Sequence, residues 1–202
     1  MCVLVYVAKV VLRRCVRSVA NQRIVVMTAR TIAEFSGGNA RVALALAATV
    51  GRNESICGLS DADLFKRLFQ QRHEHDANLL LIAQACSLVY SFEGIKTSGE
   101  GAELPILARL VGKSVAEVYA AVAELKRRDL MQERAQWRAV LPHAIANRLA
   151  TLALQDIPIA TVMDALVINA TARLRRSFSR RLGYLDDSKE ARAIVKEWLS
   201  PA

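Results

Sequence analysis

Aromatic residues make up only 5% of the 202-residue sequence, which also contains just four prolines, nine glycines and four cysteines. Proline and glycine are the strongest helix breakers, so their scarcity leaves long segments free to form helices. The hydrophobic content of 53% excludes a disordered chain. Much alanine, leucine and valine beside few aromatics favours packed helices. We therefore predict a mainly α protein of one or two small domains.

Metal-binding and membrane-spanning motifs are also missing. The polar segment RHEHDAN contains His73 and His75 but no third ligand close by, so we interpret it as a solvated linker. The apolar start MCVLVYVAKVVL is short and is interrupted by Lys9, which argues against a signal peptide or a membrane span. We expect a cytoplasmic protein with no metal site. The four cysteines show no CxxC spacing and lie in or beside apolar runs, as free thiols do: Cys2, Cys15, Cys57 and Cys86.

The net charge of +9 and the pI of about 9.8 are compatible with nucleic acid, with an acidic protein partner, or with a piece of a larger and more neutral chain. The positive charge gathers in two places. The clusters are Arg13, Arg14 and Arg17 near the start, and Arg173, Arg175, Arg176, Arg180 and Arg181 near the end.

The segment Leu104–Pro142 predicts a short helix, a tight turn, a longer helix and a two-stranded hairpin. Pro105 suits a first helical turn, and Ser114 with Glu117 forms a capping-box pattern. The strands are predicted at Leu130–Glu133 and Trp137–Leu141. This order is that of a winged helix-turn-helix. The buried face of its longer helix is predicted to contain Val115, Val118, Tyr119, Val122 and Leu125.

Helices are predicted on both sides of this segment. Asn39 should cap a helix over Ala40–Val50 after the stop Ser36-Gly37-Gly38. Arg41 in its first turn is either a solvated side chain or part of an anion site. The other predicted elements are helices at Asp61–Gln71, Asn78–Phe92, His143–Leu154 and Ile159–Arg176, an irregular joint at Ser177–Asp187, a capping box of Asp187 and Glu190, and a last helix at Ala191–Leu199 that buries Ala191, Ile194, Val195 and Trp198.

The sequence contains no phosphate-binding GxxxxGK[ST] motif and no acidic pair placed to hold Mg²⁺. Gly112-Lys113-Ser114 matches only the end of that motif, because Leu107 stands where the first glycine is needed. No Ser/His/Asp set or paired carboxylates are apparent either. We therefore do not expect the chain to be an enzyme by itself.

The order of the segments resembles the back half of a STAND-type NTPase of the AAA+ kind. FSGGNARVALALA resembles the lid's sensor-2 helix, LPILARLVGKSVAEVYAAVAELKRRDLMQ resembles the winged-helix domain, and SFSRRLGYLDDSKEARAIVKEWL resembles the helical arm before the repeats. The resemblance implies that Arg41, with Asn39 and Gly38, contacts the phosphates of ATP. A histidine of the family's winged helix also touches the nucleotide. His143 stands just past the hairpin, and we interpret it as a surface or core histidine.

The resemblance implies a mainly α fold with a helical lid, a winged helix-turn-helix domain and a C-terminal helical arm. The parts would be residues 28–72, 78–154 and 155–202, with residues 1–27 a remnant of the upstream core or irregular. Such a chain senses nucleotide and switches conformation without catalysis, and ATP or ADP binds only together with the missing core. The implied partners are that core, a downstream repeat or sensor domain and other copies of the chain, with no membrane contact.

The alternative is a free-standing winged-helix DNA-binding protein. The early part of the recognition helix has no Arg, Asn or Gln that could contact base edges. The available cations suit contacts with the DNA backbone: Lys113, Lys126, Arg127, Arg128, Arg134 and Arg138.

Overall fold

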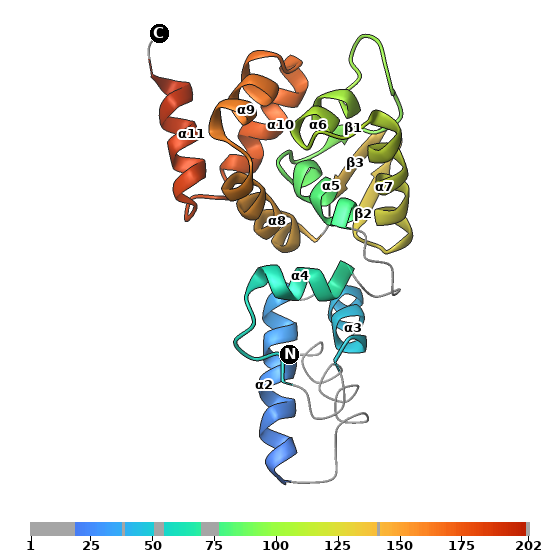
Figure 1. Cartoon of the computed structure of the whole chain (residues 1–202), viewed down its shortest axis with the longest axis vertical. Helices are drawn as coiled ribbons and strands as arrows, with labels where there is room; N and C mark the ends of the chain where they lie inside the picture. Colours follow the sequence, from blue (N-terminus) through green and yellow to red (C-terminus); the bar gives the residue numbers. More distant parts are fainter. Residues whose placement is uncertain (1–18, 38, 51–54, 70–76, 141, 201–202) are drawn as a thin grey trace. The chain divides into compact units, whose positions relative to one another are not determined.

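The computed structural model describes residues 19–37, 39–50, 55–69, 77–140 and 142–200, and it divides into two compact units between Asp76 and Ala77. The apolar start MCVLVYVAKVVL lies outside these residues. The described part is mainly helical, as predicted (Figure 1). We describe each unit by itself.

The first unit contains the helices α2 (Val19–Phe35), α3 (Ala40–Ala48) and α4 (Asp61–Phe69). The Asn39 side chain caps α3 as predicted, since its Oδ1 accepts a hydrogen bond from the Val42 amide at 3.1 Å. Phe35 of α2 packs edge-on against Phe65 of α4, with ring centroids 4.8 Å apart. The apolar stripe predicted for Ala40–Val50 is buried, with Val42 and Leu46 in α3 and Val50 two residues after it.

The second unit is built around α5 (Ala77–Ser87), which packs against three other helices and a strand (Figure 1). Residues 82–89 are all buried. The remaining elements are β1 (Phe92–Glu93), α6 (Leu104–Leu110), α7 (Val115–Arg127), β2 (Met131–Arg134), β3 (Trp137–Val140), α8 (His143–Asp156), α9 (Ile159–Met163), the π-helix η1 (Asp164–Ile168), α10 (Ala172–Leu182) and α11 (Lys189–Leu199).

A three-stranded antiparallel sheet joins the hairpin to β1, in the order β1-β3-β2. The predicted hairpin is confirmed, with Met131 opposite Val140 and Arg134 opposite Trp137. Its partner β1 was not predicted, because Phe92 was assigned to the end of the preceding helix. That helix ends at Ser87, and Phe92 pairs with Arg138 instead.

The turn before α7 and the start of that helix form as predicted. Gly112 has φ of +62°, a conformation that suits glycine. The capping box is complete: Ser114 Oγ accepts the Glu117 amide at 3.2 Å, and Glu117 Oε2 accepts the Ser114 amide at 2.8 Å. Tyr119 was wrongly placed on the buried face. Its side chain is 47% exposed, and Ala121 is buried instead.

Four predictions near the C-terminus are wrong. The single helix over Ile159–Arg176 is interrupted, because η1 follows α9 and Thr171 begins a new helix by accepting the Leu174 amide on its Oγ1 at 3.1 Å. The first half of the predicted irregular joint is therefore part of α10. The cap of α11 is Ser188 rather than Asp187, and Val195 is 39% exposed instead of buried.

Candidate functional site

The basic side chains in α7 and directly beside it form ion pairs with carboxylates of the same chain. Glu124 lies 2.7 Å from Arg127 Nε and 2.6 Å from Arg128 Nε. Lys113 lies 3.9 Å from Glu117, and Lys126 pairs with Glu133 of β2. The side-chain hydrogen bond to Arg128 is the largest cause that lowers the pKa of Glu124. The cations predicted to contact DNA are thus largely held in local ion pairs.

The two hairpin arginines differ in exposure. Arg134 is exposed, whereas Arg138 is only 7% exposed. Arg138 contacts Glu133 Oε1 at 3.0 Å and donates to the Ala135 carbonyl at 2.7 Å. Its stem crosses Gly94 so closely that a Cβ on residue 94 would lie 2.3 Å from Arg138 Cγ. Arg138 is therefore mainly part of the packing of the sheet.

The predicted phosphate-binding residues of the first unit are only partly described. The Asn39 side chain caps α3, and Arg41 belongs to the first turn of that helix. Gly38 and the Arg41 side chain lie outside the described part of the chain. Asn39 therefore lies at the N-terminus of α3 as predicted, and the contact of the three residues with a phosphate stays a prediction.

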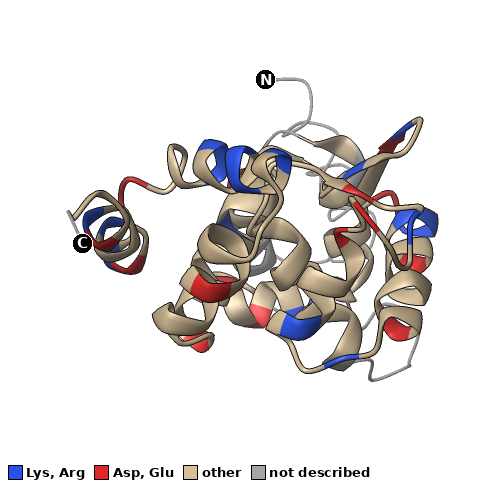
Figure 2. Cartoon of the chain, turned by 90° about the horizontal axis from the view of Figure 1, so that it is seen from above, with Lys and Arg blue, Asp and Glu red and all other residues tan. Residues whose placement is uncertain are grey.

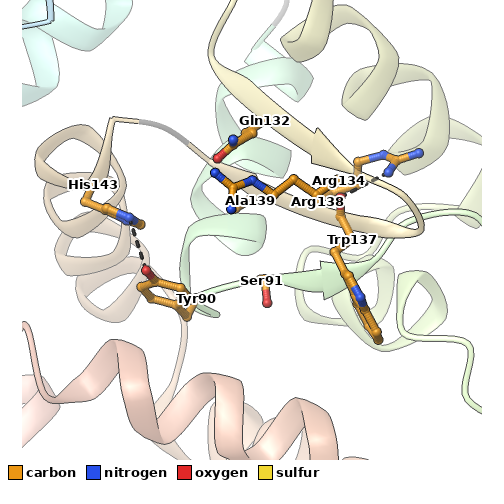
Figure 3. A pocket seen from close by; sticks show the side chains of 8 residues that line it. All are labelled: Tyr90, Ser91, Gln132, Arg134, Trp137, Arg138, Ala139 and His143. Atoms are coloured by element: carbon orange, nitrogen blue, oxygen red, sulfur yellow. Dashed lines mark hydrogen bonds between the residues drawn. The ribbon is translucent and has the colours of Figure 1, made fainter.

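A cavity of about 290 Å³ opens beside the hairpin, where β2, β3, the segment before β1 and the start of α8 meet (Figure 3). Tyr90 and His143 lie on one side of it, and Trp137 lies at the other end. No aspartate or glutamate lines this cavity, whose lining consists of Tyr90, Ser91, Gln132, Arg134, Trp137, Arg138, Ala139 and His143. Aromatic walls with cationic groups and no carboxylate suit an anionic or planar ligand.

Tyr90 and His143 form a stacked pair with ring centroids 4.9 Å apart, and the Tyr90 hydroxyl lies 3.3 Å from His143 Nε2 (Figure 3). Burial lowers the pKa of His143, and the nearby cations Arg181 and Arg180 lower it further. The imidazole is therefore mostly neutral at pH 7. A bound anion would favour the charged imidazole and raise its pKa.

Two arginines of α10 have their guanidinium groups close to the Tyr90 ring. The Arg180 guanidinium lies 3.7 Å from the Tyr90 ring centroid. Arg181 is fully buried, donates to Asn147 Oδ1 at 2.5 Å, and lies 5.6 Å from the same ring. Burial lowers the pKa of Arg181 to about 10, so the group keeps its charge at neutral pH.

A buried carboxylate joins α10 to the sheet. The Glu103 side chain is only 2% exposed, and its oxygens accept from the Glu93 amide at 2.6 Å and from Arg173 Nε at 2.5 Å. Arg173 also donates to the Ser91 carbonyl at 2.9 Å and lies over the Trp137 ring. Sequence reasoning found the arginine cluster but missed Tyr90, Ser91 and Glu103, because nothing in their local sequence marks them.

No family model, curated protein or solved structure was found to match the chain. In the described residues, no helix is both long and apolar enough to cross a membrane. The same part of the chain contains no group of three or more His, Cys, Asp or Glu side chains that could hold a metal ion.

Proposed function

We propose that the chain is the regulatory, nucleotide-sensing portion of a STAND-type ATPase and that residues 78–154 form its winged helix-turn-helix domain. The order of helices, the capped helix α7 and the hairpin support this reading. In this proposal α7 is a packing and switching element, and the P-loop core that hydrolyses ATP lies outside the 202 residues.

The observation that carries the proposal is the acid-free cavity beside the hairpin, with His143 at its edge. A neutral imidazole that lines the same cavity as Arg134 can gain a proton when a phosphate approaches, which couples the ligand to the hairpin and α8. The position of His143 at this cavity favours a role in sensing the ligand over the earlier interpretation of His143 as a structural histidine. The Arg41 contact stays a prediction, and with it the low hydrolytic activity expected of the chain alone.

The native gene product tests this proposal directly. An antibody raised against the purified chain should detect a polypeptide much larger than 22.2 kDa, and its reading frame should contain a GxxxxGK[ST] motif ahead of residue 28. In that larger protein, we expect His143→Ala to change the rate of ADP release measured with a fluorescent analogue. A native product of only 22.2 kDa whose reading frame has no such motif would contradict the proposal. Steady ATP turnover by the chain alone would also contradict it.

The free-standing DNA-binding protein is the second candidate, and the net charge of +9 favours it. It requires that α7 and the hairpin contact the duplex. We expect the Lys126→Ala and Arg127→Ala variants to leave duplex binding at low salt unchanged, because both cations already pair with carboxylates. A loss of duplex binding of roughly tenfold in these variants would instead support the DNA-binding protein.

A further inference from the structure

We propose that the outer surface of α10 and the turn that follows it bind single-stranded nucleic acid, with Arg176 and Arg180 contacting phosphates and Tyr184 stacking on a base. We call these three residues the α10 stripe. The inference goes beyond the proposed function, because it requires neither ATP or ADP in the cavity beside the hairpin nor the His143 side chain.

The charge of α10 is the first observation. Five of its eleven residues are arginines and none is acidic. Only Arg173 has a carboxylate partner, Glu103, in the part of the chain that the structure describes. Arg176 and Arg180 are both exposed, and the view from above shows basic residues following one another along this helix (Figure 2). Such a surface attracts a polyanion.

The buried Arg181 strengthens this positive potential. Among the described residues, its guanidinium has no carboxylate partner and its Nε has no hydrogen-bond acceptor. A charge buried without a counterion is costly for folding and is poorly screened by solvent. Arg181 therefore adds to the field at the neighbouring Arg180 without being able to contact a ligand itself.

Aromatic rings gather at the same place, although the chain has few of them. Tyr184 is 51% exposed and stacks at 6.2 Å on Tyr90, which in turn contacts Arg180 and His143. Two of the four tyrosines of the chain therefore lie beside its most basic helix. Exposed rings next to arginines are the usual means of holding single strands, because every base has a face on which a ring can stack.

The spacing of the stripe fits an extended strand. Arg176 and Arg180 are one helical turn apart, about 6 Å along the axis, and Tyr184 comes four residues later. Two neighbouring phosphates can therefore be held while a splayed base reaches the ring. Paired bases of a duplex are stacked inside and cannot reach Tyr184, so single strands are favoured. An acidic peptide would need the arginines but not the ring.

Fluorescence anisotropy of labelled oligo(dT) and oligo(U) of about 20 nucleotides, titrated with the full chain over a range of salt concentrations, tests this inference. We expect Arg176→Ala/Arg180→Ala to lower the slope of log K against log salt by about 1.4, because each lost phosphate contact in a single strand removes about 0.7. Tyr184→Ala should weaken binding roughly tenfold, and Tyr184→Phe should bind like the wild type.

The matched control is Arg192→Ala/Lys196→Ala, which removes two exposed cations one turn apart from the neighbouring helix α11. It should change the salt slope much less than the α10 variant. Circular dichroism is used to check that every variant is folded. A polyglutamate of equal charge should bind at least tenfold more weakly than the oligonucleotides.

Three results would overturn the inference: no binding at low salt, equal losses in the α10 variant and the α11 control, or unchanged binding by Tyr184→Ala together with tight binding of polyglutamate. The last result would assign the stripe to an acidic protein. None of them bears on the size or P-loop of the native protein, so the two proposals fail separately.

Discussion

The helices α7 and α10 both contain basic side chains, yet these cations have different partners. On α7, Glu117 and Glu124 lie three or four residues from a lysine or arginine and bind it. On α10 there is no acid, and the one ion pair that it forms with the described residues reaches Glu103, 70 residues away. The number of cations on a helix therefore does not predict its partners. What matters is whether a carboxylate lies within one turn or within the fold.

The largest expected effect tests the long-range pair of α10. Glu103→Ala removes a buried acceptor and leaves Arg173 and the Glu93 amide without it. We expect a loss of about 3 kcal/mol in the free energy of unfolding, at the low end for a broken buried ion pair because Arg173 keeps some access to water. Urea unfolding followed by circular dichroism measures it. Glu100→Ala on the same loop, which is exposed, should cost little. Equal effects of the two substitutions would mean that the Glu103 pair adds no stability.

The caps of the two helices allow a more even comparison. Ser114 caps α7 and Thr171 caps α10, each by accepting a backbone amide. Ser114→Ala and Thr171→Ala should each lower the free energy of unfolding by about 1 kcal/mol, since each leaves an amide without its acceptor. Ser179→Ala, at an exposed position inside α10, should be nearly neutral in the same urea titration. If Ser114→Ala is also neutral, α7 is held by packing alone.

Removing an acid from α7 should make it resemble α10. Glu124→Gln takes away the carboxylate that binds Arg127 and Arg128. We expect a stability loss below about 1 kcal/mol, because the pairs are partly exposed, and tighter binding of oligo(dT) at low salt. Anisotropy measures the affinity, and Glu197→Gln on α11 gives the same change of charge as a control. Equal gains by both variants would show that only net charge matters.

The smallest expected effect is on the pKa of His143, the stacking partner of Tyr90. Arg180→Gln removes a cation that disfavours the charged form of His143, so the pKa of His143 should rise, though only slightly because burial is the larger cause. Histidine ring signals in an NMR pH titration report this shift. Because the pKa of His143 is lowered in the folded state, stability should fall as the pH drops below about 6.5. Lys189→Gln should leave the His143 titration unchanged, and a downward shift in Arg180→Gln would contradict the assignment.

Local signals made part of this molecule predictable. The capping box of Ser114 and Glu117 and the hairpin depend on residues close together in the chain, so the sequence contains the whole pattern. The strand β1 was missed because its two residues pair with Trp137 and Arg138, which are more than 40 positions away. Tyr119 fits the apolar period of α7 but is exposed, since periodicity cannot show where the neighbouring elements end.

The candidate site was less predictable than the fold. The arginines of α10 were visible as a cluster, but their distribution among buried, paired and exposed positions is set by contacts with distant residues. Arg181 donates hydrogen bonds to Asn147 and Val89, and Arg173 donates hydrogen bonds to Glu103 and Ser91. Tyr90 gains its neighbours in the same way, from α8 and α10. No local sequence pattern indicates such contacts between residues that are far apart in the chain.

The hydrogen bond from the Glu93 amide to Glu103 has a consequence for the timing of motions in the second unit. Arg173 and the Thr171 hydroxyl hold the same carboxylate. The amide proton of Glu93 can therefore exchange with solvent only after this carboxylate is released. We therefore expect the exchange rates of Glu93 in β1 and of the first turns of α10 to report one shared opening event, in which the sheet edge and the arginine helix open as a single cooperative unit.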